Sequence, residues 1–175
     1  VEGYRSRAAY KLEELLQRDL MLKPGMVIVD LGAAPGGWSQ LLAQKSKGRC
    51  RIVAIDLLEM PPIAGVDFLQ ADFSSENGLA ALDRLIDGAP VDLVLSDMAP
   101  NMTGVKDVDI VRSYALAELA LDFAQQRLKP GGSFAIKLFQ GEGFDSYLRA
   151  LRGRFAKVLI RKPEASRDRS RELYA

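Results

Sequence analysis

The stretch that most constrains the fold of this chain is residues 26–38, Met-Val-Ile-Val-Asp-Leu-Gly-Ala-Ala-Pro-Gly-Gly-Trp. It opens with a short apolar run rich in β-branched side chains, which is typical of a buried parallel strand. A helical pattern begins at Trp38, after a turn that contains Gly32, Gly36 and Gly37. A strand, a glycine turn and a helix bring bare backbone and a helix N-terminus close to a ligand, because glycine has no Cβ.

The glycine turn departs from the dinucleotide-binding pattern G-x-G-x-x-G. Ala34 stands where the second glycine of that pattern would be. Pro35 has no N–H to donate where a pyrophosphate would need one. The turn therefore suits a nucleoside with a short amino-acid tail better than a dinucleotide. A plain strand-to-helix turn without a ligand also fits these residues.

The rest of the chain repeats the order strand, helix, strand. Apolar runs predict further strands at residues 51–56, 66–72, 91–97, 133–139, 155–162 and from 172 onward. Helical patterns cover residues 6–20, 37–46, 76–87, 107–128 and 144–152. This alternation indicates an α/β, Rossmann-like fold with a doubly wound, seven-stranded and mostly parallel sheet.

Ligands of such sheets bind at the carboxyl ends of the strands, and three acids stand at these ends: Asp56, Asp72 and Asp97. Asp56 lies about 20 residues beyond the glycine turn, where related folds place an acid for ribose hydroxyls. Asp72 would bind the edge of the base. The glycine turn and these acids together predict a nucleoside site.

The 175-residue chain contains no histidine and one cysteine, Cys50. The commonest general base, a cysteine metal cluster and an internal disulfide framework are therefore excluded. No apolar stretch approaches the roughly 20 residues of a membrane-spanning helix. We expect a cytoplasmic protein whose chemistry relies on carboxylates, lysines, hydroxyls or a cofactor, without a metal.

Two lysines and one basic segment deserve a functional interpretation. Lys137 lies inside an apolar predicted strand, where a charge is costly unless it has a role or a partner. Lys11 lies beside the apolar stripe of its helix, either over the edge of the buried face or extended to solvent.

Residues 157–171 hold six basic and two acidic side chains in a chain of net charge +1. This segment fits a phosphate footprint or a solvated charged face equally well.

Several motifs resemble those of the FtsJ/RrmJ-type RNA 2′-O-ribose methyltransferases, which use S-adenosylmethionine. They are residues 30–38 (Asp-Leu-Gly-Ala-Ala-Pro-Gly-Gly-Trp), 96–101 (Ser-Asp-Met-Ala-Pro-Asn), 137–143 (Lys-Leu-Phe-Gln-Gly-Glu-Gly), 5–12 and 166–174. The resemblance spans essentially the whole chain. It is nearest to the bacterial branch that modifies a uridine in the aminoacyl-tRNA-binding loop of large-subunit ribosomal RNA. It implies one class I methyltransferase domain over residues 1–175. Because the sequence opens at Val1 without a methionine and stops at Ala175, we expect both termini to be truncated. We also expect a monomer.

The resemblance also assigns residues. It implies a Lys-Asp-Lys-Glu catalytic tetrad at Lys11, Asp97, Lys137 and Glu172. Contacts to S-adenosylmethionine, or to the product S-adenosylhomocysteine, fall on Gly36, Trp38, Asp56, Asp72, Phe73 and Asp97. As a hypothesis, RNA phosphates bind to Arg5, Arg7, Arg167, Arg169 and Arg171.

Lys137 is the candidate acceptor for the proton of the ribose 2′-hydroxyl, since a protonated hydroxyl is a poor nucleophile. Burial and Lys11 would favour its neutral amine, whereas Asp97 and Glu172 would favour its ammonium form. Two roles therefore stay open for Lys137, a neutral base or a cation that stabilises a forming alkoxide. Asp97 would orient Lys137, while Lys11 and Glu172 would position the ribose and Lys137.

Other functions predict other residues. An NAD-dependent oxidoreductase leaves the motif at 96–100 without a role. A methyltransferase for amino groups of bases would place Asn/Asp-Pro-Pro-aromatic after the fourth strand, and Asp97-Met-Ala-Pro lacks the aromatic residue. A non-catalytic RNA-binding relative would not need the tetrad. Among 2′-O-methyltransferases, a transfer RNA or an mRNA cap is the alternative substrate.

Overall fold

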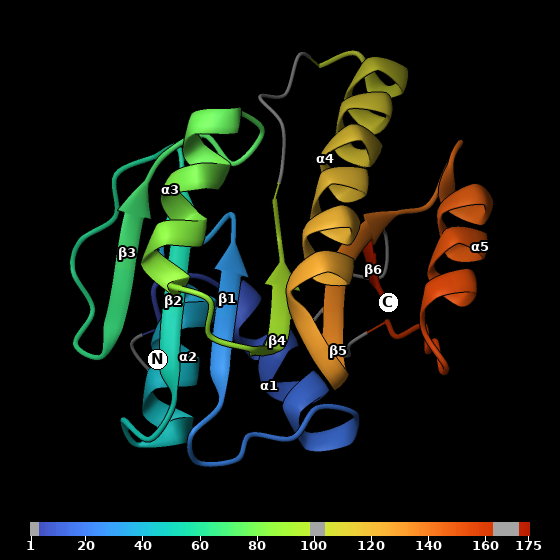
Figure 1. The fold of residues 1–175 in the computed structure, drawn as a ribbon. Helices are drawn as coiled ribbons and strands as arrows, with labels where there is room; N and C mark the ends of the chain where they lie inside the picture. Colours follow the sequence, from blue (N-terminus) through green and yellow to red (C-terminus); the bar gives the residue numbers. More distant parts are fainter. Residues whose placement is uncertain (1–3, 99–103, 163–171) are drawn as a thin grey trace.

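The computed structural model describes residues 4–98, 104–162 and 172–175 (Figure 1). Its centre is a six-stranded sheet with the strand order β3-β2-β1-β4-β5-β6. The first five strands pair in parallel, and β6 pairs antiparallel to β5. The strands are β1 (Val27–Leu31), β2 (Arg51–Asp56), β3 (Val66–Gln70), β4 (Val91–Ser96), β5 (Leu128–Phe139) and β6 (Glu172–Tyr174).

Helices cover both faces of the sheet, as expected for a doubly wound fold (Figure 1). They are α1 (Ala8–Arg18), α2 (Gly37–Ser46), α3 (Glu76–Ile86), α4 (Lys106–Arg127) and α5 (Phe144–Arg154). None of these helices, which belong to the described part of the chain, is both long and apolar enough to cross a membrane.

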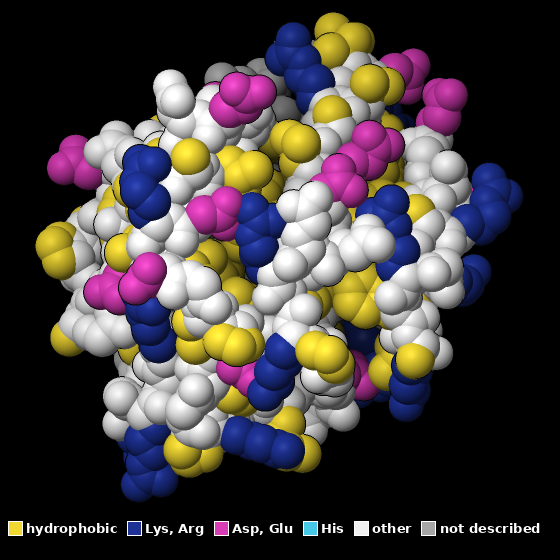
Figure 2. Space-filling model, viewed as in Figure 1, with side chains coloured by type: hydrophobic (Ala, Val, Ile, Leu, Met, Phe, Trp, Pro, Cys, Tyr) yellow, Lys and Arg dark blue, Asp and Glu magenta, His cyan; other side chains and the backbone are white. Residues whose placement is uncertain are grey.

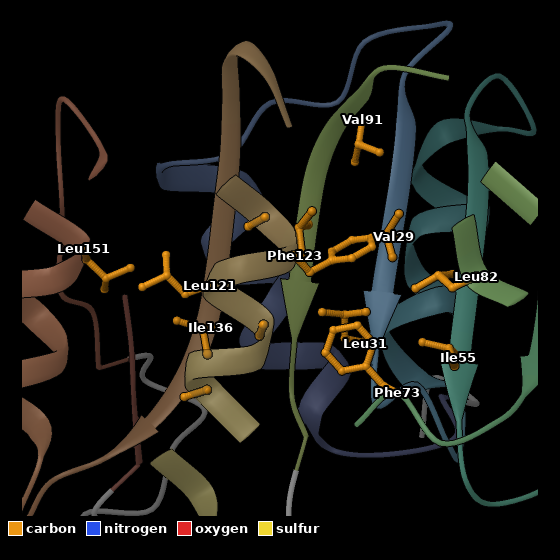
Figure 3. Packing of buried hydrophobic residues seen from close by; sticks show 14 of the residues in the cluster. Val29, Leu31, Ile55, Phe73, Leu82, Val91, Leu121, Phe123, Ile136 and Leu151 are labelled. Atoms are coloured by element: carbon orange, nitrogen blue, oxygen red, sulfur yellow. The ribbon is translucent and has the colours of Figure 1, made fainter. Parts of the chain in front are cut away.

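The central strands are apolar on both faces because each face packs against helices. Val29 and Leu31 of β1 lie in one core cluster with side chains of α3, α4 and α5 (Figure 3). Ile28, the residue before Val29, points to the opposite face and lies in a second cluster with side chains of α1 and α2. Successive strand residues point to opposite faces, so an unbroken apolar run is what a two-sided core requires.

The strand predicted at 155–162, the sixth of seven along the chain, is not confirmed. In this segment only Arg161 pairs, through an isolated antiparallel bridge to Tyr174. The bridge consists of two backbone hydrogen bonds of 2.7 and 2.9 Å between these residues. Because β6 is three residues long and its other edge pairs with β5, it offers this segment too short an edge for a ladder. The α/β class and the mostly parallel sheet agree with the prediction.

Candidate active site

The glycine turn lies between β1 and α2, at the carboxyl ends of the parallel strands. Gly32 has a φ of +75°, and a Cβ added to it would lie 2.8 Å from the Met98 Cα atom. A Cβ on Gly37 would lie 2.3 Å from the Ser6 hydroxyl oxygen. The sequence analysis expected glycine in this turn so that a ligand could approach the backbone. At these two positions the group that approaches is another part of the chain.

A small cavity of about 120 Å³ opens beside this turn. Its walls combine the turn itself with Ser6 and Ala8 of the N-terminal segment, Asp30 of β1 and Asp97 after β4. The cavity therefore brings together backbone, hydroxyl and carboxylate groups from three separate parts of the chain.

Asp30 is the functional candidate that sequence reasoning missed. Its side chain is fully buried, and the Ser39 hydroxyl donates a 2.7 Å hydrogen bond to its Oδ2 atom. Among the described residues, its Oδ1 atom has no hydrogen-bond partner. Burial raises the pKa of Asp30 to about 7; the Ser39 hydrogen bond opposes this rise, and the Asp97 and Asp56 carboxylates add to it. An acid inside the apolar run of 26–31 was the available signal.

The four residues of the predicted tetrad converge beside the cavity. Lys137 Nζ lies 2.8 Å from Asp97 Oδ1, and Lys11 Nζ lies 3.1 Å from Glu172 Oε2. The four side chains come from α1, the end of β4, β5 and β6. The antiparallel pairing of Phe139 with Glu172 brings the carboxylate of β6 to the end of β5 that carries Lys137.

These two ion pairs form one electrostatic cluster. Burial raises the pKa of Asp97, the ammonium group of Lys137 opposes this rise, Glu172 adds to it, and Lys11 opposes it. The Lys137 side chain is only 11% exposed and also lies 5.4 Å from the centre of the Phe139 ring. The cluster is partly shielded from water, where charges interact more strongly than at the surface.

The two acids predicted to bind the nucleoside already accept backbone hydrogen bonds. The Ala34 N–H donates to Asp56 Oδ2 and the Leu58 N–H donates to Asp56 Oδ1, both at 2.9 Å. Asp72 accepts from the Ser74 N–H at 2.9 Å. Asp56 thus holds the glycine turn against the end of β2, and each carboxylate oxygen keeps lone pairs for a ligand.

The two aromatic residues predicted at the cofactor are largely buried. Trp38 is 3% exposed, and its indole N–H donates a 2.7 Å hydrogen bond to the Ala8 carbonyl. Phe73 is 8% exposed and packs edge-on against Phe123, as Figure 3 shows. Only small parts of these two residues are available to a ligand.

The predicted RNA-binding arginines fall into three groups. Arg167, Arg169 and Arg171 lie outside the described residues. Arg7 is exposed, whereas the guanidinium group of Arg5 donates hydrogen bonds to backbone carbonyls near the glycine turn. On the face in Figure 2, lysine and arginine side chains are scattered among acidic ones and do not form a single patch.

A model of the family described as FtsJ-like methyltransferase matches residues 4–175. The chain belongs to the FtsJ-like methyltransferase family. This membership confirms the resemblance seen in the motifs and the fold class predicted from the sequence. It also favours methyl transfer over the oxidoreductase alternative.

Relatives agree with this family assignment. A protein of Stenotrophomonas maltophilia (strain R551-3), named ribosomal RNA large subunit methyltransferase E, is 63% identical over 174 residues. The match covers 99% of this chain and 83% of that protein. The protein of that name from Xanthomonas campestris pv. campestris (strain B100) is 61% identical over 173 residues, which are 99% of this chain and 82% of the relative.

A solved structure supports the same fold. The crystal structure of a protein described as a ribosomal RNA methyltransferase from Plasmodium falciparum matches with a TM-score of 0.86 at 32% identity. The match covers 98% of this chain and 95% of that chain. The FtsJ-like fold therefore extends over essentially the whole chain.

Proposed function

We propose that this protein transfers a methyl group from S-adenosylmethionine to a ribose 2′-hydroxyl of large-subunit ribosomal RNA. The proposed target is a uridine in the aminoacyl-tRNA-binding loop. The observation that carries the proposal is the cluster of Lys11, Asp97, Lys137 and Glu172 beside the cavity of the glycine turn. The names of the relatives support the ribosomal substrate over a transfer RNA or an mRNA cap.

The residues around the glycine turn fit S-adenosylmethionine. The unpartnered, buried Oδ1 atom of Asp30 suits a cationic group such as an α-ammonium. The N-terminus of α2, at Gly36 and Trp38, suits a carboxylate. Asp56 and Asp72, at the ends of neighbouring strands, suit the ribose hydroxyls and the base. When bound there, S-adenosylmethionine supplies a methyl group already activated by its sulfonium.

The tetrad residues would handle the ribose hydroxyl. In its neutral amine form, Lys137 accepts the 2′-hydroxyl proton and becomes an ammonium group. Asp97, whose carboxylate lies 2.8 Å from the Lys137 nitrogen, holds this nitrogen in place and pairs with the charge that forms. Lys11 and Glu172 position the ribose and Lys137. A well-placed proton acceptor contributes about 10²- to 10⁴-fold in rate, and alignment of the reacting atoms on the order of 7–11 kcal/mol.

RNA binding would add contacts outside the tetrad. Arg7 lies in the N-terminal segment, directly before helix α1, which carries Lys11. We assign RNA phosphates to it and to Arg167, Arg169 and Arg171. The enzyme would act in the cytoplasm as a monomer.

One experiment tests the proposal directly. Purified protein is incubated with labelled S-adenosylmethionine and large ribosomal subunits from cells that lack this modification, and the modified position is mapped by its blocked 2′-hydroxyl. Protein-free ribosomal RNA is the parallel substrate. We expect one blocked ribose in the aminoacyl-tRNA-binding loop. Methyl groups found on bases would contradict the proposal.

A further inference from the structure

The Arg5 side chain joins two loops that border the glycine turn. Its Nη1 atom donates to the Pro61 carbonyl at 2.7 Å and to the Pro35 carbonyl at 3.2 Å. Its Nη2 atom donates to the Pro62 carbonyl at 3.1 Å. Pro35 belongs to the glycine turn, whereas Pro61 and Pro62 belong to the connection between β2 and β3. One guanidinium group therefore links these two loops to the N-terminal segment.

The Arg5 side chain also lies close to the backbone of the glycine turn at Gly36. A Cβ added to Gly36 would lie 3.0 Å from Ile63 Cδ1, 3.0 Å from Met60 Sδ and 3.1 Å from Arg5 Nη1. The backbone at Gly36 is thus enclosed by the 60–63 connection and by Arg5. The Arg5 side chain therefore forms one part of the wall around the Gly36 backbone.

The rest of the N-terminal segment is held to the same place. The Arg5 N–H donates to Gln40 Oε1 of α2 at 2.9 Å, and the Trp38 indole donates to the Ala8 carbonyl at 2.7 Å. Helix α1 begins at Ala8 and carries Lys11, which pairs with Glu172. The segment that Arg5 anchors therefore connects the glycine turn directly to the tetrad.

We propose that Arg5 is a positioning residue of the cofactor site and not a ligand of RNA phosphates. Its guanidinium group holds the glycine turn against the 61–62 connection and fixes the start of the segment that carries Lys11. Three carbonyl acceptors use the planar, forked donors of arginine, which a lysine ammonium does not reproduce. The inference rests on the proposed use of S-adenosylmethionine as the methyl donor.

The chemistry distinguishes the two roles of Arg5. A phosphate ligand tolerates lysine, because an ammonium group also binds phosphate as a point charge. The role of bridging three carbonyls is lost when lysine replaces arginine, because an ammonium group lacks the planar fork of donors. Arg5→Lys keeps the charge and the aliphatic stem, so this variant separates the two roles while preserving the net charge of the protein.

The test compares wild type, Arg5→Lys, Arg5→Gln and Arg18→Gln. Arg18 is exposed in the last turn of α1, and Arg18→Gln is the control because it removes one positive charge, as Arg5→Gln does. Calorimetry gives the Kd of S-adenosylmethionine, filter binding over a salt series gives RNA affinity, and thermal unfolding verifies that each variant is folded. We expect both Arg5 variants to raise the cofactor Kd and KM by about tenfold or more. We expect the RNA salt slope to be unchanged in both, and Arg18→Gln to match wild type in cofactor affinity.

Two results would overturn the inference. An unchanged cofactor Kd in Arg5→Gln, together with a salt slope smaller by about one, would make Arg5 an RNA ligand. Full cofactor affinity in Arg5→Lys would show that charge alone suffices. Failure of the wild-type protein to bind S-adenosylmethionine would instead refute the proposed function, and the inference with it.

Discussion

The buried Asp30 carboxyl makes a quantitative prediction about stability. In the folded protein burial raises its pKa from 3.8 to about 7. Below about pH 4 the group is protonated in both the folded and the unfolded state, so folding does not have to bury an ionised carboxylate. As the pH rises toward 7, the unfolded chain releases this proton while the folded protein retains it. The free energy of unfolding therefore falls through this range, and the loss is complete above about pH 7.

The size of the loss follows from the pKa difference. The step from 3.8 to about 7 corresponds to on the order of 4 kcal/mol, at about 1.36 kcal/mol per pH unit. This is a large share of the roughly 5–15 kcal/mol by which domains are stable. Asp30→Asn removes the titrating group, while the amide oxygen still accepts the Ser39 hydrogen bond. The variant should gain stability relative to wild type as the pH rises, by up to about 4 kcal/mol.

Urea unfolding at several values from about pH 5 to pH 8, without S-adenosylmethionine, measures this difference. Ser39→Ala is the matched control, because it removes the hydrogen bond that opposes the rise in the pKa of Asp30. In that variant the pKa of Asp30 should rise further, so its loss of stability should continue to a higher pH than in wild type. Parallel pH profiles of wild type and Asp30→Asn would refute the reasoning, because they would show that Asp30 is ionised in the folded protein throughout.

Three further predictions concern the site. Lys137→Ala should abolish methyl transfer but leave cofactor affinity nearly unchanged, because in the proposed function this side chain acts on the ribose and not on the methyl donor. Near-normal turnover with labelled donor would remove Lys137 from the mechanism. Asp56→Ala should weaken cofactor binding by calorimetry, since it removes the proposed acceptor for the ribose hydroxyls and the acceptor of the hydrogen bond from the Ala34 N–H of the glycine turn. An unchanged Kd would contradict this. Gly32→Ala should lower the free energy of unfolding by roughly 1–3 kcal/mol, because its Cβ would meet the Met98 backbone at 2.8 Å; equal urea midpoints would disprove it.

The sequence by itself determined the α/β class and most element boundaries, and it predicted a site at the carboxyl ends of the strands. These properties depend on local patterns, namely apolar runs, helical periodicity and glycine turns, which neighbouring residues set together. The charge of Lys137 inside an apolar run was visible for the same reason. Helix α2 matches its predicted range of 37–46, and α3 ends within one residue of its predicted end.

Only the tertiary structure decided which of these groups meet. Lys11 and Glu172 form an ion pair across 161 residues of sequence, and no local pattern marked Glu172. The predicted strand at 155–162 had the right composition, yet a ladder requires a partner edge of sufficient length. Arg5 carries the charge of an RNA ligand, but its guanidinium lies among carbonyls of distant loops. A side chain's role follows from its partners, and packing brings those partners together.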